Sequence, residues 1–210
     1  MCGRFYVDEG TAKEIERVIR GIDLRIQKMR TGDIYPSQPA GILTCHSRQK
    51  EPLAPDLVTP NAPAFELKEM HWGFPQYQKK GLLINARAET ALERRTFCDS
   101  VRYRRCIIPA KHFYEWDSDK NKVIFFREDR PVLFMAGFYN RFQNEERFMI
   151  LTTQANASVS PVHNRMPVVL DESELEDWVY DDKFMEYALH KTPPELWRKQ
   201  EYEQQSLFLT

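Results

Sequence analysis

Apolar and polar residues alternate most regularly in the middle of the chain. Residues 122–129 (KVIFFRED), 131–142 (PVLFMAGFYNRF) and 147–154 (RFMILTTQ) are three apolar runs separated by charged turns. This arrangement is typical of a β-meander. Shorter stretches with strand character are expected at residues 2–7, 42–47, 68–75, 81–89 and 106–116.

Three other stretches have a helical pattern. Residues 12–29 place isoleucine and valine at helical spacing, and residues 90–105 carry charges on one face. Residues 173–191 are amphipathic, with Ser173 as the N-cap and Glu176 at the third helical position. A serine and a glutamate at this spacing predict a capping box at the start of that helix.

These elements predict an α+β fold, in which a curved, mainly antiparallel β-sheet or barrel-like core is flanked by helices. Glycine and proline predict irregular structure at residues 31–41 and 51–65. No element is predicted for residues 192–210. A chain of 210 residues fits one domain, so we expect a single domain over 1–210.

Composition and charge are those of an ordinary globular protein. Apolar residues make up 42% and charged residues 29%, and the formal net charge is -1. Because there is no overall basic field, any surface for nucleic acid must be a local patch. The sequence has no apolar run of transmembrane length and no apolar signal-peptide core, so we expect a cytoplasmic protein that contacts no membrane.

The four cysteines are Cys2, Cys45, Cys98 and Cys106. They form no CxxC pair and no metal-ligand spacing with the histidines, so we predict free thiols, no metal site and no cofactor. Three of them lie in mixed apolar and polar stretches and are interpreted as structural. Cys2 differs by its position, because removal of Met1 would make it the N-terminal residue.

Four short segments each combine strand-like apolar residues with one polar residue that a core does not favour. They are MCGRF with Cys2, INARAET with Asn85, HFYEW with Glu115, and HNRMPVVL beginning at His163. Alone, each has a plain structural explanation: Glu115 can face solvent, Asn85 can end a strand and His163 can cap a turn. Together they supply a nucleophile, an amide donor and two proton-transfer groups.

The same segments, with Trp72–Gly73, RCIIPA at residues 105–110 and TTQANASVSPVHNRMPVVL at residues 152–170, resemble the SOS-response-associated peptidase (SRAP) family. The resemblance runs from Cys2 to about Leu170. It implies a β-rich α+β fold. It also implies that Met1 is removed and that Cys2 reacts covalently with abasic sites in single-stranded DNA.

The implied chemistry depends on a free N-terminal cysteine. An opened abasic sugar is an aldehyde, and an aldehyde condenses with an unprotonated amine. An α-amino group has a reference pKa of about 7.7–8.0 against about 10.4 for lysine, so far more of it is neutral at pH 7. The thiol of the same residue then closes on the imine carbon to give a thiazolidine. An internal cysteine lacks this amine.

The resemblance also implies roles for other residues. Asn85 holds the opened sugar and the Cys2 end, Glu115 transfers protons during imine formation, and His163 acts as a second acid or base. An autoproteolytic step is implied by the family name. The residues expected to contact phosphates or bases are Arg4, Pro36, Tyr77, Arg87, Trp116 and Arg165. We expect a monomer whose partner is single-stranded DNA with abasic sites, associated with the nucleoid when bound, and the replication machinery as a further partner.

One loop and two single residues depart from the family pattern. Only Phe74 and Tyr77 offer aromatic rings in the loop FPQYQKKG, where bacterial relatives often place a wedge between DNA strands. His112 replaces a usual glycine, and Asp33 replaces a common asparagine. An acidic side chain on the path of a phosphate weakens DNA binding. Two alternatives stay open: a non-covalent reader of damaged or modified DNA, and an N-terminal-nucleophile amidohydrolase.

Overall fold

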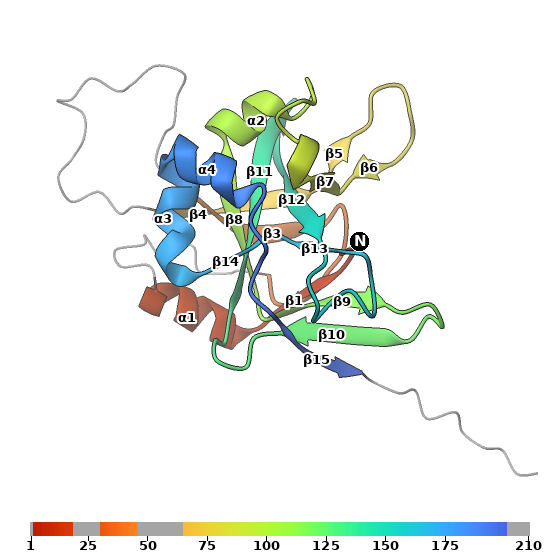
Figure 1. Ribbon diagram of the computed structural model, residues 1–210. Coiled ribbons are helices and arrows are strands. Elements are labelled where there is room, and N and C mark those ends of the chain that lie inside the picture. The colour runs from red at the N-terminus through yellow and green to blue at the C-terminus, as the bar shows by residue number, and fades with distance from the viewer. Residues whose placement is uncertain (1, 19–29, 46–64, 201–210) are drawn as a thin grey trace, which may run out of the picture.

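The core of the protein is a ring of five strands. The computed structural model describes residues 2–18, 30–45 and 65–200 (Figure 1). Each ring strand pairs with two others, and every pairing is antiparallel except the parallel contact between β12 and β4. In ring order the strands are β3 (Pro39–Thr44), β4 (Glu66–Trp72), β12 (Glu145–Gln154), β11 (Leu133–Phe142) and β8 (Arg105–Ala110). The predicted α+β fold with a barrel-like, mainly antiparallel core is confirmed.

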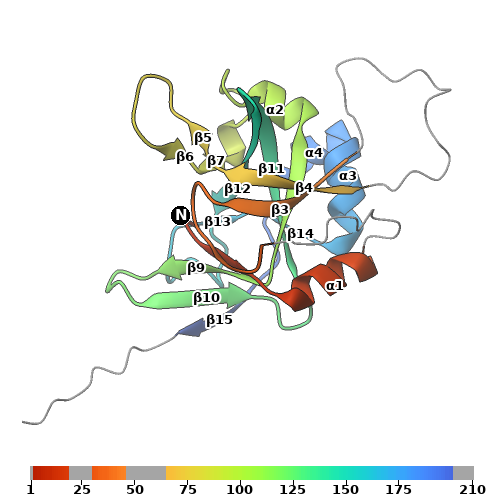
Figure 2. The same cartoon turned by 180° about the vertical axis from the view of Figure 1, so that it is seen from behind.

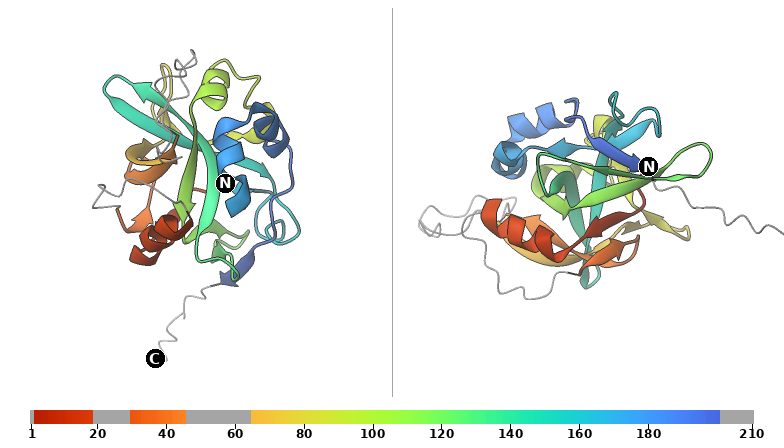
Figure 3. Two further views of the ribbon diagram at one scale, coloured as in Figure 1. Left: turned by 90° about the vertical axis from the view of Figure 1, so that its left-hand side faces the viewer. Right: turned by 90° about the horizontal axis from the view of Figure 1, so that it is seen from below.

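A second, five-stranded antiparallel sheet packs against this barrel (Figures 1 and 2). The chain passes from the barrel to this sheet across a single residue, Lys111, between β8 and β9. Its strands, in order, are β15 (Trp197–Gln200), β10 (Lys122–Phe126), β9 (His112–Trp116), β1 (Phe5–Val7) and β2 (Gly32–Ile34). Strand β15 ends the sheet and lies at the lower edge of the molecule in Figure 1 and in the left view of Figure 3.

Short strands extend the barrel, and helices cover one side of it. Helices α3 and α4 lie together on one flank, with α2 at the top of the view in Figure 1. The helices are α1 (Glu9–Val18), α2 (Cys98–Tyr103), α3 (Leu175–Tyr180) and α4 (Asp182–Ala188), with 3-10 turns at Ala88–Thr90 and Glu172–Glu174. The short strands are β5 (Phe74–Pro75), β6 (Leu82–Leu83), β7 (Asn85–Arg87), β13 (Arg165–Pro167) and β14 (Val169–Leu170).

Buried side chains form two clusters on the two faces of the barrel wall. One cluster contains Val101 of α2, Trp178 of α3 and Met185 of α4, so it joins the barrel to the helices. The other contains Phe5 of β1 and Phe113 of β9, so it joins the barrel to the second sheet. Burying apolar area on both faces holds the strand ends in fixed positions.

The predicted β-meander is partly wrong. Strands β11 and β12 form a hairpin as expected, but β10 pairs with β9 and β15 in the second sheet. The alternation of apolar residues indicates that a segment is a strand, but it does not indicate which other strand the segment pairs with. Strand β15 comes from the tail for which no element was predicted, and β2 and part of β3 come from the predicted loop at residues 31–41.

The helix predictions are also only partly correct. Of the two predicted caps, Asp8 and Thr11, Asp8 precedes helix α1, which begins at Glu9, and it accepts a hydrogen bond from the backbone N–H of Thr11 at 2.8 Å. The predicted residues 19–29 of this helix lie outside the described part of the chain. The predicted helix over residues 90–105 is confined to α2, and β8 begins at Arg105.

The predicted helix over residues 173–191 is interrupted. Asp181 has an extended backbone, and its side chain accepts hydrogen bonds from the N–H groups of Lys183 and Phe184. Asp181 therefore ends α3 and caps α4. The capping box is formed by Asp171 and Glu174 rather than by the predicted Ser173 and Glu176. An aspartate that bonds locally thus overrides the apolar periodicity.

Candidate functional site

Cys2 lies immediately before β1 and is buried, with 1% of its surface exposed. Its thiol donates a weak hydrogen bond to the carbonyl of Arg4, with an S···O distance of 3.6 Å. Burial raises the pKa of the Cys2 thiol well above its ordinary value, and the negative charge of Glu115 raises it further. The thiol is therefore held in its protonated form at neutral pH.

Asn85 reaches Cys2 from a distant part of the chain. It begins β7, which lies parallel to β12 with Asn85 opposite Ile150. The side-chain amide N–H of Asn85 donates to the backbone carbonyl of Cys2 at 2.8 Å. Among the described residues, the amide oxygen of Asn85 is buried and accepts no hydrogen bond. Asn85 therefore holds the N-terminal end with its donor and keeps an acceptor at the same place.

Glu115 and His163 bring a carboxylate and an imidazole to the same region. Glu115 lies in β9 and is only 2% exposed, against the expectation for an isolated glutamate. Its Oε1 atom lies 4.0 Å from Nδ1 of His163, which follows the turn after β12. Burial raises the pKa of Glu115, and the neighbouring His163 opposes this shift. The structure thus brings together Cys2, Asn85, Glu115 and His163, all four of the predicted catalytic residues.

The ring of His163 is oriented by the backbone of Arg165. The N–H of Arg165 donates to Nδ1 of His163 at 3.0 Å, and the carbonyl of Arg165 lies 3.2 Å from the same atom. A neutral Nδ1 can accept from the N–H, and a protonated Nδ1 can donate to the carbonyl. Both protonation states of the ring therefore have a backbone partner at one residue, which suits a group that exchanges protons.

Two of the three arginines predicted to contact phosphates are already paired with carboxylates. Arg165 forms a bidentate pair with Glu89, with both N···O distances 2.8 Å. Arg4 donates from its Nη2 to Asp33. Arg87, at the end of β7, is exposed and forms no ion pair with the described residues. Arg87 is therefore the predicted phosphate ligand whose charge is available without a rearrangement.

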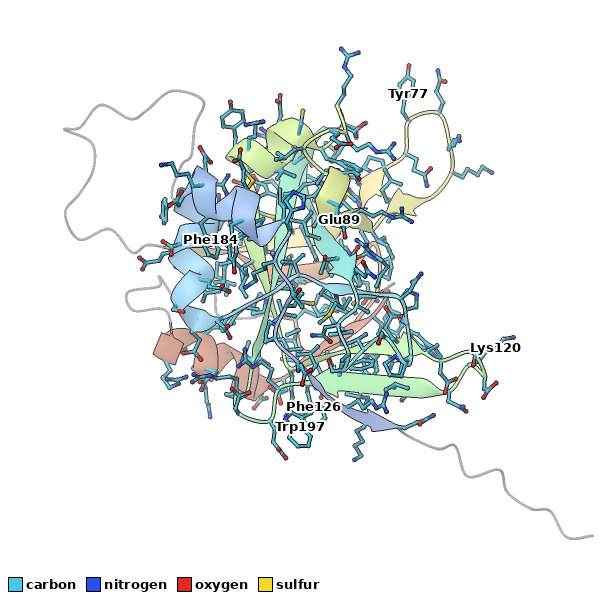
Figure 4. All side chains as sticks on the ribbon, in the orientation of Figure 1. Tyr77, Glu89, Lys120, Phe126, Phe184 and Trp197 are labelled. Carbon is cyan, nitrogen blue, oxygen red and sulfur yellow. The ribbon has the colours of Figure 1, made fainter. Side chains whose placement is uncertain are left out.

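The apolar residues predicted to contact bases lie on the surface. Trp116 follows Glu115 at the end of β9 and is 40% exposed. Pro36 is half-buried in the turn between β2 and β3. Tyr77 is 87% exposed in the turn between β5 and β6, and Figure 4 places it at the outer end of this hairpin. His112, the residue at a usual glycine position, stacks on Tyr6 with ring centroids 4.9 Å apart.

A cavity opens beside Asn85. It has a volume of about 380 Å³, and Asn85, Arg87 and Arg94 contribute to its lining. A second cavity of about 560 Å³ is lined in part by Tyr77 and Lys79. The two cavities share Leu83 and Thr96, so they are adjacent. Arg94 was not among the predicted site residues, because the charge pattern placed it on the charged face of the predicted helix over residues 90–105.

The described residues provide no evident place for a metal ion, since no three histidine, cysteine, aspartate or glutamate side chains are grouped so that they could hold one. Within the same residues, none of the helices has both the length and the apolar character needed to cross a membrane.

The sequence profile of the family described as SOS response associated peptidase (SRAP) matches residues 1–204. The chain belongs to the SRAP family. Among curated relatives of this SRAP chain, the abasic site processing protein YoaM of Bacillus subtilis is 33% identical over 127 residues, or 54% of this chain and 56% of YoaM. The abasic site processing protein YedK of Escherichia coli is 33% identical over 121 residues, or 54% of each chain. The chain thus spans about half the length of the curated relatives it matches.

Solved structures share the fold over nearly the whole chain. A crystal structure of a protein from Bordetella bronchiseptica has a TM-score of 0.75 at 20% identity and covers 96% of this chain and 100% of its own. A crystal structure of a protein from Bacteroides thetaiotaomicron has a TM-score of 0.71 at 20% identity and covers 95% of this chain and 91% of its own. At this identity the likeness concerns the fold, and it agrees with the barrel described above.

Proposed function

We propose that this SRAP chain processes abasic sites in single-stranded DNA by forming a covalent link through Cys2. Removal of Met1 frees the α-amino group of Cys2. The amine adds to the aldehyde of the opened sugar and loses one water to form an imine. The thiol then adds across the C=N bond: sulfur bonds to the imine carbon, and the thiol proton goes to the nitrogen. The product is a thiazolidine.

The observation that carries this proposal is the hydrogen bond from Asn85 to the carbonyl of Cys2. This bond joins residues 83 positions apart in the sequence. A buried carbonyl needs a partner in any case, but this partner is a side chain whose buried amide oxygen stays without a hydrogen bond to the described residues beside Cys2, which a strand opening does not require. The names of the curated relatives, which are abasic site processing proteins, point to the same substrate.

Each neighbouring group has a defined task in this reaction. Asn85 keeps the amine in place, and its free amide oxygen accepts a hydrogen bond from the opened sugar. The negative charge of Glu115 opposes loss of the buried thiol proton to solvent, so the Glu115 carboxylate itself is the proposed base that passes this proton to the nitrogen. His163 exchanges a proton with the sugar hydroxyl during ring opening. These assignments follow general acid–base chemistry, which requires groups within reach of the reacting atoms.

The DNA contacts in this proposal use a local surface. Arg87 binds a phosphate beside the cavity next to Asn85, and Trp116 and Pro36 contact the bases on either side of the abasic site. Stacking of one base on an aromatic side chain contributes about 1–3 kcal/mol. Tyr77 lines the adjacent cavity and contacts DNA beyond the lesion. Such a surface explains how a chain with a net charge of -1 could bind DNA.

An oligonucleotide with a single abasic site tests the proposal directly. The protein and the oligonucleotide are incubated, heated in detergent and separated on a denaturing gel. We expect a shifted band for the wild type and none for Cys2→Ser. The matched control is Cys98→Ser, because Cys98 is also a free thiol and is less buried than Cys2. Intact mass should equal the sum of the two components minus one water, with Met1 absent.

Borohydride separates imine formation from ring closure. Cys2→Ser keeps an N-terminal amine, so borohydride should trap its imine and give a band that is absent without the reductant. A band of equal strength from Cys2→Ser without borohydride would rule out the thiazolidine. Binding without any covalent band would instead support the non-covalent reader. Release of ammonia from small amides would support the amidohydrolase.

The family name also implies an autoproteolytic step, and Glu115 and His163 are the groups that would assist hydrolysis of the Met1–Cys2 bond. Glu115→Gln should then retain Met1 in the purified protein, whereas Cys98→Ser should lose it. Complete loss of Met1 in Glu115→Gln would assign the removal to a cellular aminopeptidase.

A further inference from the structure

The Arg4–Asp33 pair lies at the rim of the site. Arg4 follows Cys2 by two residues, and its Nη2 donates to Oδ2 of Asp33. The guanidinium carbon lies 4.5 Å from the ring centroid of Tyr114 and 5.0 Å from that of Tyr35, so the charge is held between two aromatic rings. The side chains of Arg4 and Asp33 are 20% and 27% exposed, so solvent and a ligand can reach the pair.

Each residue of this pair has one buried polar side-chain atom without a hydrogen bond to the described residues. These atoms are Nε of Arg4 and Oδ1 of Asp33. Nε and Nη2 lie on the same edge of the guanidinium, which can bind two oxygens of one phosphate or carboxylate. Asp33 therefore occupies this edge through one bond, where a better placed anion would form two.

We propose that Asp33 occupies, in the DNA-free protein, the position on Arg4 that a phosphate of the DNA takes on binding. The phosphate displaces Oδ2 and binds both Nε and Nη2. The inference rests on the proposed function, because it assumes that Arg4 faces the DNA backbone. Its consequence is that Asp33 sets how tightly the protein holds single-stranded DNA before any covalent bond forms.

The position of Asp33 keeps its charge close to the bound phosphate. Asp33 lies in the middle of β2 and is opposite Tyr6 in the register with β1, so its backbone cannot move away. Although partial burial acts in the opposite direction, the hydrogen bond from Arg4 lowers the pKa of Asp33, which keeps the carboxylate charged at neutral pH. A displaced Asp33 therefore repels the phosphate that replaces it. Undamaged DNA is released readily, and only an abasic site, which reacts with Cys2, is retained.

The Arg165–Glu89 pair does not have these properties. Glu89 binds Arg165 through both oxygens, and Nη2 of Arg165 also donates to the carbonyl of Thr152. The Arg165 side chain is 14% exposed, and its backbone orients His163. Displacing Glu89 would therefore break two good hydrogen bonds and disturb the imidazole. Arg4 is the arginine whose carboxylate partner can be exchanged.

The test compares Asp33→Asn with the wild type on an undamaged, labelled oligothymidine of about 15 nucleotides. Fluorescence anisotropy is measured at several salt concentrations. We expect Asp33→Asn to bind about two- to fivefold more tightly, the range expected when one partly exposed charge pair is released. The plot of log affinity against log salt should steepen by about 0.7, because Arg4 now binds a phosphate as an unpaired cation.

Two variants control for the change in net charge. Asp129→Asn makes the same substitution at an exposed carboxylate that pairs with Arg127. Asp129 lies in the turn after β10, at the other end of this strand from the turn that joins β9 to β10. Asp129→Asn should bind like the wild type. In the Arg4→Ala background, Asp33→Asn should produce no more change than Asp129→Asn does. Thermal unfolding of each variant verifies that it is folded.

The outcomes separate this inference from the proposed function. If the wild type forms the Cys2-dependent adduct but Asp33→Asn leaves affinity and salt slope unchanged, the role of Asp33 is wrong and the proposed function stands. If Asp33→Asn tightens binding in an Arg4-dependent way and no adduct forms, the role of Asp33 stands and the thiazolidine is wrong. Equal tightening by Asp129→Asn, or no binding by any variant, overturns the role of Asp33.

Discussion

The backbone N–H of Arg165 donates a hydrogen bond to Nδ1 of His163 at 3.0 Å. The side chain of Arg165 is fixed in turn by Glu89 and by the carbonyl of Thr152. The ion pair therefore acts on the imidazole through the backbone of one residue. The predicted contact of Arg165 with DNA stays a prediction. From these contacts we infer that Arg165 also positions His163, and the first prediction tests this role.

Glu89→Gln should slow adduct formation at saturating oligonucleotide by about tenfold. The reason is that an amide cannot form the bidentate pair with Arg165, and a small displacement of a catalytic group reduces the rate strongly. The rate constant is measured from denaturing gels over time. Glu93→Gln, at an exposed glutamate in the same segment, is the matched control and should react like the wild type. Equal rates for Glu89→Gln and the wild type would exclude the positioning role.

Glu115 should make the stability of the protein depend on pH. Burial raises its pKa above the ordinary value of 4.5, so the folded protein holds this proton more tightly than the unfolded chain does. The stabilisation is fully present below the unfolded pKa and is lost as the pH rises through the folded pKa. Glu115→Gln cannot ionise, so it should become more stable than the wild type as the pH increases above about 4.5.

The measurement is the melting temperature of both proteins across this pH range. The difference between Glu115→Gln and the wild type should grow with pH and then level off. A difference that does not change with pH would show that the carboxylate is ionised without cost in the folded protein. At neutral pH the same variant should form the adduct more slowly, so stability and activity should change in opposite directions.

The sequence was sufficient for most of the strands, and the four central residues that it selected lie together in the structure, while their catalytic roles stay predictions. Strands β11 and β12 have long apolar runs, and their pairing across a short charged turn is local. The site residues were predicted as a set from four short segments. What could not be predicted was the partner of a segment distant in sequence, such as β10 beside β15, since periodicity carries no information about pairing.

The ionic pairs at the site were likewise not predictable. Asp33 lies in β2 and Arg4 immediately precedes β1, and Glu89 and Arg165 are distant in the sequence, so both pairings depend on the folded protein. Composition counts these arginines as available positive charges. The structure shows that carboxylates already neutralise two of the three, which changes which residue is expected to contribute most to DNA affinity.

Arg87 should contribute more to DNA affinity than its position on the surface suggests. It is exposed beside the cavity that contains Asn85, and no described acidic side chain pairs with it. Arg87→Ala should weaken binding to an undamaged oligonucleotide and should reduce the salt slope by about 0.7. Arg198→Ala removes an exposed arginine from the edge strand β15 and serves as the control. Equal losses for both variants would point to a diffuse charge effect and not to a phosphate site.

Trp116 should supply a stacking surface for a base next to the lesion. It is 40% exposed and directly follows the buried Glu115, whereas Trp197 in β15 is 57% exposed and lies at the lower edge of the molecule in Figure 4. Trp116→Ala should weaken binding to single-stranded DNA by about tenfold or more, the effect expected for losing one stacked base. Trp197→Ala, the matched control, should leave affinity unchanged although it removes a more exposed ring.

Anisotropy gives both affinities, and quenching of tryptophan fluorescence by DNA should disappear in Trp116→Ala alone. If Trp197→Ala had the larger effect, the DNA path would follow β15, away from Cys2, and the proposed arrangement of bases around the site would be wrong.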